Sequence, residues 1–252
     1  MNNTKITILS RLRDESLLIP DFLNHIDKFG DEFFFLDDCS NDDSVDLLRS
    51  HPKTKKVLRN YFHSRDQSHV QTSQRKLLLD YARNHSKNKW FALIEPDERI
   101  VDFDFSKIDK YDKQGITGIY LQLLDGYLTP KYKKPYTGGK LEDIKRLWGV
   151  EMREIMFFFQ KDCVDYDICV PGCRQPNLSK GDYTTDGWVK HFSKCISKEK
   201  YEADCDYYTQ SMPMLAEKWK KRKGTAIKKD YKSDFGTTLY KWPEVKKHII
   251  KI

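Results

Sequence analysis

The sequence contains no long hydrophobic run. None of its apolar stretches approaches the roughly 20 residues that a helix needs to cross a bilayer, and charged residues make up 33% of the 252-residue chain. Internal repeats and low-complexity segments are also missing. These features predict a soluble protein at the upper end of single-domain size, with ample length for one core.

A secretory signal is the second absence. Residues 1–5 lead directly into a predicted strand and leave no room for an apolar leader, so we expect a cytoplasmic protein. Its six cysteines are therefore expected to be free thiols. The spacing Cys169-x3-Cys173, followed by His191-x3-Cys195, offers a zinc site as an alternative, although structural zinc sites favour tighter cysteine pairs.

The third absence is a glycine-rich phosphate loop. The first predicted strand, residues 5–10, is followed by Arg-Leu-Arg-Asp-Glu-Ser, which contains no glycine. A nucleotidyltransferase would be expected to carry such a loop at this point. A nucleotidyltransferase is therefore only a secondary alternative.

The positive charge is concentrated at one end of the chain. The net charge is +7, and residues 217–252 contain 12 Lys/Arg and 4 Asp/Glu, which gives +8 and leaves 7 − 8 = −1 for residues 1–216. The basic segment also carries aromatic residues, so it could contact an anionic membrane, a phosphorylated glycan or nucleic acid. The plainer alternative is a solvated helical face.

Strand and helix patterns alternate through the first part of the chain. Short apolar runs and 3.6-residue periodicity predict a parallel α/β sheet. In the second part of the chain, the sequence pattern predicts more strands, a surface loop at 125–140 and two helices near the C-terminus. The predicted strands are 5–10, 33–36, 56–58, 90–94, 116–124, 154–160, 167–170 and 187–192, and the predicted helices are 17–29, 44–48, 77–82, 198–208 and 214–221.

Acidic residues follow two of the buried strands. The run at 90–94 ends at Pro96, which cannot donate to a sheet, and Glu95, Asp97 and Glu98 surround that proline. Asp37-Asp38 follows the strand at 33–36 in the same way. Because ligands of open α/β sheets bind outside the carboxyl ends of the strands, these oxygens predict a Mg²⁺ or Mn²⁺ site. The alternative is a solvated acidic turn.

Several motifs in this order resemble the family 2 glycosyltransferases with the GT-A fold. They are ITILSRLRDES, FFFLDDCSNDDS, the QRK at 74–76, WFALIEPDERI and the later WVKHFSKCISKEKYEAD. The resemblance spans most of residues 5–208. It implies an α/β GT-A fold with a mainly parallel sheet, flanking helices and a mixed acceptor-side half.

The resemblance also implies roles for individual residues. Asp97 matches the last acid of the family's Asp-x-Asp motif and would bind the metal, with His191 as a further ligand. Glu95 stands where the family has the first Asp. The residues expected to bind the nucleotide-sugar donor are Ser10, Arg11, Asp38, Arg75, Glu95 and Glu98.

The catalytic base is less constrained. An inverting enzyme needs a carboxylate that takes the proton of the acceptor hydroxyl, and the family's usual position has no acid here. Glu151 is our first choice because it directly precedes a core-type strand. Asp125, Asp165 and Asp186 remain open, and a retaining mechanism would need no such base.

Together these features predict a metal-dependent glycosyltransferase that moves a sugar from a nucleotide-diphosphate sugar to a saccharide or lipid-linked saccharide. Residues 1–216 would form the GT-A domain, with a donor half at about 1–105 and an acceptor half at about 106–216. Residues 217–252 would form a basic extension that packs on this domain or is appended to it and that could contact an anionic membrane. The alternatives are a glycosyltransferase-like protein that binds or modifies nucleic acid, and a binding module without catalysis.

Overall fold

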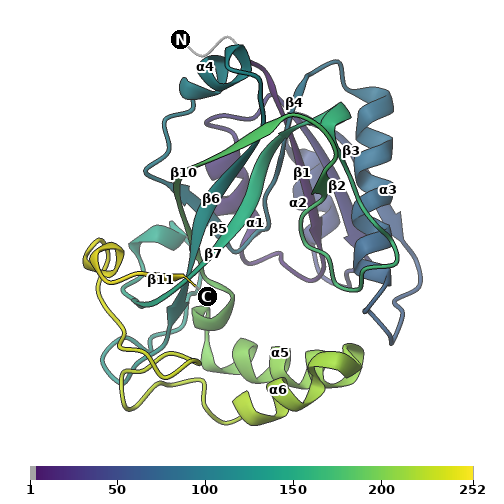
Figure 1. Ribbon diagram of the computed structural model, residues 1–252. Helices are drawn as coiled ribbons and strands as arrows, with labels where there is room; N and C mark the ends of the chain where they lie inside the picture. The colour runs from purple at the N-terminus through teal and green to yellow at the C-terminus, as the bar shows by residue number, and fades with distance from the viewer. Residues whose placement is uncertain (1–3, 252) are drawn as a thin grey trace.

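The computed structural model describes residues 4–251 (Figure 1). Its main feature within that range is a nine-stranded sheet with the order β3-β2-β1-β4-β7-β6-β10-β5, and β11 pairs with β7. Strands β1 to β4 are parallel neighbours, whereas β7 runs antiparallel to both β4 and β6. The strands are β1 Ile6–Leu12, β2 Glu32–Asp38, β3 Thr54–Asn60, β4 Trp90–Leu93, β5 Glu98–Val101, β6 Ile116–Tyr127, β7 Leu147–Gln160, β10 Asp182–His191 and β11 Ile250–Lys251.

Helices cover both faces of the parallel part of the sheet. Side chains on a strand point alternately to opposite faces, so Phe33 and Phe35 of β2 pack with α1 (Ile19–Ile26) and α2 (Ser44–Ser50). Phe34 and Leu36 point the other way and pack with α3 (Val70–His85). This double burial explains the continuous apolar runs. The expected α/β fold, a large and mainly parallel sheet flanked by helices, is confirmed.

The sheet is strongly curled. Strands β4 and β5 are joined by only four residues, 94–97, yet they lie four strand spacings apart in the sheet. In a flat sheet those spacings would total about 19 Å, and only a fully extended link could reach that far. The link is instead closed by a hydrogen bond from the Glu98 N–H to the Glu95 carbonyl, at 3.0 Å. Curling therefore brings the β10–β5 edge back to the end of β4.

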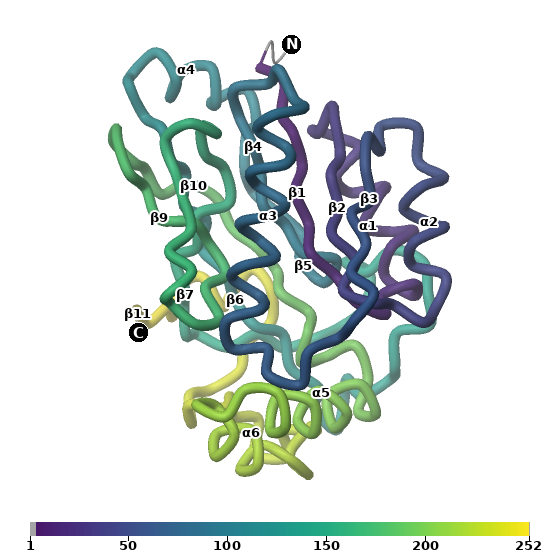
Figure 2. The backbone as a smooth tube through the Cα atoms, turned by 90° about the vertical axis from the view of Figure 1, so that its right-hand side faces the viewer, coloured from purple at the N-terminus to yellow at the C-terminus, as the bar shows by residue number. Residues whose placement is uncertain are grey.

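The C-terminal part of the chain packs against the sheet rather than extending from it. Helices α5 (Lys198–Ser211) and α6 (Ala216–Arg222) lie together beneath the sheet in both views (Figures 1 and 2). Beyond them, the chain forms β-bridges from Ile227 to Leu128 and from Tyr240 to Trp148. Lys246 lies over the rings of Trp188 and Trp242. Lys228 is buried and Lys246 is half-buried, whereas most of the other basic residues in this segment are exposed.

Some elements differ from the sequence expectations. Strand β7 begins at Leu147, before the predicted start at 154, so Glu151 lies within it. The predicted strand at 167–170 is wrong: the Val170 N–H donates to the Asp167 carbonyl, and this closes a turn before Pro171-Gly172. Strand β5 and helix α4 (Lys107–Lys113) were not expected. Among the described residues, no helix has the length and apolar character of a membrane span.

Candidate functional site

The turn after β4 holds three carboxylates at the carboxyl edge of the parallel strands. Pro96 ends the β4 ladder, and the turn then closes on itself: the Glu95 N–H donates to the Glu98 carboxylate at 2.8 Å. Glu98 already belongs to β5, which pairs with β10. The acidic turn is thus fixed on both sides by strands.

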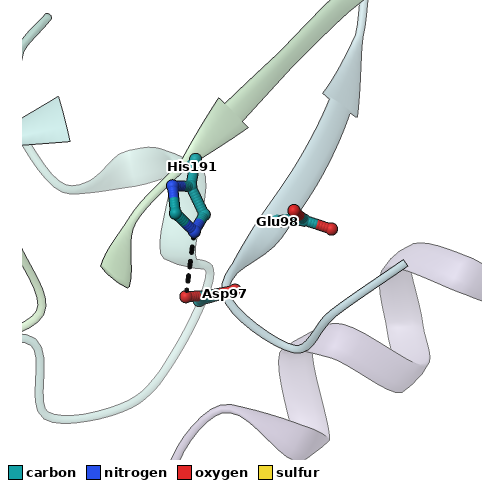
Figure 3. A group of neighbouring side chains, drawn as sticks. All are labelled: Asp97, Glu98 and His191. Carbon is teal, nitrogen blue, oxygen red and sulfur yellow. Dashed lines mark ion pairs between the residues drawn. The ribbon is translucent and has the colours of Figure 1, made fainter. Parts of the chain in front are cut away.

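His191 completes this group from the other side. It is the last residue of β10 and lies opposite Glu98 in the antiparallel ladder. Its Nε2 atom is 3.4 Å from Oδ2 of Asp97 (Figure 3). One ligand atom from each of Asp97, Glu98 and His191 can be chosen so that all lie within 4.8 Å of one another. Two carboxylates and an imidazole at this spacing fit a divalent cation such as Mn²⁺.

The electrostatics of this group favour a positively charged His191 and a negatively charged Asp97. Burial alone would lower the pKa of His191, but Asp97 and Asp125 outweigh it and raise the pKa to about 10. Burial likewise acts to raise the pKa of Asp97, and the neighbouring His191 outweighs it, so that the pKa is lowered. A metal would replace the imidazolium proton, because a histidine must be neutral to bind it.

Asp125 fixes the orientation of His191. It lies on β6, and its Oδ1 is 2.5 Å from Nδ1 of His191. Arg153 donates to Asp125 at 2.7 Å and Lys194 at 2.8 Å, so the carboxylate stays charged. A carboxylate on the second ring nitrogen is the usual partner of a metal-binding histidine. Asp125, which the sequence left open as a base, contacts His191, Arg153 and Lys194 in this structure.

Two arginines neutralise the other acids of the turn. Nη2 of Arg75, from α3, is 2.6 Å from the Glu95 carboxylate. Nη2 of Arg174 is 2.6 Å from Oε1 of Glu98. Arg174 comes from the loop after β8 (Val164–Asp165), where no sequence pattern marks it. Sequence analysis missed this residue.

Two of the expected donor residues lie behind the site rather than in it. Asp38 is fully buried and receives hydrogen bonds from Gln74 at 2.6 Å, Arg11 at 2.7 Å and Asn60 at 3.0 Å. Its carboxylate therefore holds Arg11, which does face the cavity. Ser10 is also fully buried, and within residues 4–251 its hydroxyl has no hydrogen-bond partner.

The remaining predicted residues share one cavity of about 690 Å³. Helices α5 and α6 form its far wall. Glu151 lines the cavity from β7, and the hydroxyls of Ser233 and Thr237 donate to its carboxylate. Glu15, in the loop after β1, also lines it, and burial raises the pKa of Glu15 to about 8 even though Lys200 lies 3.5 Å away. The predicted residues on the cavity wall are Arg11, Arg75, Glu95, Asp97, Glu98, Glu151 and His191.

The cysteines do not form a metal site. All six are free thiols, as expected. Cys195 is buried, which raises the pKa of its thiol to about 12, whereas Cys169 is exposed. Across residues 4–251, the grouping of three or more possible ligands is the one around Asp97, and it contains no cysteine.

Comparisons with known proteins give two partial similarities. No family model matches the chain. Over 98 residues the chain is 33% identical to the "SPbeta prophage-derived putative HNH endonuclease YoqL" of Bacillus subtilis (strain 168). The matched region covers 36% of this chain and 41% of that protein. The chain thus spans less than half of this curated relative. The structure is also similar to that of S. aureus TarS, with a TM-score of 0.49 and 11% identity over 84% of this chain and 45% of that chain.

Proposed function

We propose that this protein is a metal-dependent glycosyltransferase of the GT-A type, which transfers a sugar from a nucleotide-diphosphate donor to a hydroxyl group. One observation carries the proposal. Asp97, Glu98 and His191 meet at the carboxyl edge of a nucleotide-binding type of sheet, inside a cavity large enough for a donor and part of an acceptor. The motifs around Asp97 and His191 resemble those of family 2 glycosyltransferases and add support.

The donor side of the cavity suits a diphosphate. Asp97 and His191, with Glu98 beside them, would hold Mn²⁺ or Mg²⁺, which when bound supplies positive charge for the leaving diphosphate. Arg75 and Arg174 lie on the same side and are paired with carboxylates that a metal could also contact. Their guanidinium groups would then be released toward the phosphate oxygens.

The acceptor side offers a candidate base. Glu151 faces the cavity, and its carboxylate is oriented by the hydroxyls of Ser233 and Thr237. In an inverting reaction it would take the proton of the attacking hydroxyl. Fixing this carboxylate in advance reduces the entropy cost of reaching the reactive geometry.

A thermal-shift panel tests the proposal. The protein is melted with individual nucleoside diphosphates and nucleotide-sugars, with and without Mn²⁺. We expect one nucleotide to raise the Tm, and only when metal is present, because a ligand that binds the native state stabilises it. If no nucleotide stabilises the protein, or if metal makes no difference, the proposed function is wrong.

A nuclease is the second candidate function, because the B. subtilis relative is named as a putative HNH endonuclease. Incubation of the protein with plasmid DNA and Mg²⁺ or Mn²⁺ separates the two candidates. Cleavage that disappears in Asp97→Asn would favour the nuclease. Intact DNA, together with metal-dependent nucleotide binding, supports the transferase.

A further inference from the structure

The acceptor side of the cavity carries more positive than negative charge. Its charged residues come from β6, β7, α6 and the segments around Lys194 and Asp234. Together with Lys228 and Asp234, which pair with this side but do not line the cavity themselves, the set contains five cations and three carboxylates, which gives 5 − 3 = +2 before His191 is counted. The cations are Arg153, Lys194, Lys218, Arg222 and Lys228, and the acids are Asp125, Glu151 and Asp234. We call this set the cationic wall.

The carboxylates of the cationic wall are already shared among several cations. The Asp234 side chain is 2% exposed and has Lys228 at 2.7 Å, with Arg222 and Lys194 both at 2.9 Å. Lys194 also contacts Asp125 at 2.8 Å. Because Asp125 and Asp234 each serve two or more cations, further negative charge would be favourable at this wall.

Lys218 marks the place on the cationic wall where a negatively charged group could bind. It faces the cavity from α6, and among residues 4–251 it makes neither an ion pair nor a hydrogen bond. Burial lowers the pKa of its ammonium group, and the nearby Arg222 and Lys194 lower it further. Lys220, two residues along the same helix, differs on both counts: it pairs with Glu217 at 2.8 Å and lies outside the cavity lining.

We infer that the acceptor carries a phosphate group, which binds at the cationic wall between Lys218, Arg153 and Arg222. Arg153 is available because its side chain is 47% exposed, and guanidinium groups match phosphate oxygens in geometry. Phe235, 53% exposed on the cavity rim, offers a flat apolar surface for a sugar ring. The assignment to the acceptor rests on the proposed transferase function, but binding of the anion does not.

The site lies close enough to the metal group to serve transfer. Nη2 of Arg153 is 3.2 Å from Nδ1 of His191, whose other nitrogen faces Asp97. The cationic wall therefore begins beside the candidate metal site and continues along α6. A phosphate anchored on it would leave the rest of the acceptor directed toward the donor.

Calorimetric titration of the metal-free protein with glucose 6-phosphate tests this inference, with glucose as the uncharged control. We expect binding of the phosphorylated sugar only. Lys218→Ala should weaken it about tenfold, the usual cost of losing a charged hydrogen-bonding partner. Lys220→Ala is the matched control on the same helix and should change affinity less than twofold. Equal effects of the two substitutions, or equal binding of glucose, would overturn the inference.

Two further measurements keep this inference separate from the proposed function. If Lys218-dependent phosphate binding is found without any metal-dependent nucleotide binding, the site stands and the transferase does not. If nucleotide binding is normal but phosphate binding ignores Lys218, the transferase stands and the site does not. A DNA duplex that binds more tightly than glucose 6-phosphate, with the same dependence on Lys218, would overturn the saccharide assignment.

Discussion

Nζ of Lys194 lies 2.9 Å from Oδ2 of Asp234, and this ion pair connects the C-terminal segment to the candidate metal site. Lys194 also contacts Asp125, which in turn contacts His191 at 2.5 Å. His191 faces Asp97 at 3.4 Å. A continuous series of charged contacts therefore runs from residue 234 to the turn after β4.

Asp234→Asn should weaken metal binding although Asp234 does not touch the metal group. Without its charge, Lys194 would shift toward Asp125 and loosen the orientation of His191. Changes behind a metal ligand typically cost about 10-fold or more in affinity, which Mn²⁺ titration followed by electron paramagnetic resonance would measure. Asp234→Glu should restore affinity, and Asp230→Asn, at an exposed residue of the same segment, should leave it unchanged. Normal Mn²⁺ affinity in a folded Asp234→Asn protein would show that the contacts do not transmit this effect.

Asp97→Asn should abolish the metal-dependent rise in Tm with nucleotide. The substitution keeps the size of the side chain but removes the charge that faces His191. The comparison is made by thermal shift with and without Mn²⁺, and Asp162→Asn, at an exposed residue of the 3-10 helix after β7, serves as the control. A variant that still responds to metal as the parent does would remove Asp97 from the metal site.

The identity of the base is tested by comparing Glu151→Gln with Glu15→Gln. If Glu151 takes the acceptor proton, its amide variant should transfer sugar about 100-fold more slowly while donor binding is unchanged. Glu15 has the pKa of about 8 that burial gives it, so a rate that depends on Glu15 would rise with pH toward 8. Rates of sugar transfer, measured from pH 6 to 9 for the Glu151→Gln and Glu15→Gln proteins, show which carboxylate acts as the base. Loss of activity in Glu15→Gln alone would contradict the role of Glu151.

The free energy of unfolding should depend on pH through the protonation of His25. This residue is buried, and its Nε2 accepts the Ile100 N–H at 3.0 Å. Burial, followed by the charges of Arg99 and Lys28, lowers the pKa of His25 to about 3. An unfolded histidine titrates near 6.5, so between pH 6.5 and 3 only the unfolded state gains the proton. The contribution of His25 to stability is therefore complete above about pH 6.5 and decreases as the pH falls below it.

Urea unfolding at pH 7, 6 and 5 measures this effect. The parent should lose about 1.4 kcal/mol per pH unit more than His25→Gln between pH 6 and 5. His85→Gln, at an exposed histidine, is the control and should follow the parent. Parallel curves for the parent and His25→Gln would show that His25 protonates equally in both states.

The first four strands of the sheet could be predicted well from local patterns. Ile6, Ile8, Phe33 and Phe35 form apolar runs whose burial on both faces needs no long-range information, and their acidic ends follow directly along the chain. Asp97 could therefore be placed at the edge of the sheet from sequence. The prediction of Asp38 as a nucleotide contact stays untested; in this structure its carboxylate accepts hydrogen bonds from Arg11 and Gln74.

The contacts that complete the candidate site from the second part of the chain could not be predicted because they are long-range. Strand β5 is only four residues long, and its partner β10 lies more than eighty residues further along. Arg174 reaches Glu98 from an irregular loop, and Ser233 reaches Glu151 across 82 positions. No periodicity or spacing encodes such pairs, since they depend on how the sheet curls.

The short link between β4 and β5 also limits how this protein can be recombined. A chimera joined at about residue 105 would inherit the acidic turn and β5 from one parent and β10 from the other. Its ladder between Glu98 and His191 would then combine two strands that had never been selected together. Donor and acceptor specificity should therefore not exchange as independent modules. Swaps that move β5 and β10 together are the ones expected to yield folded hybrids.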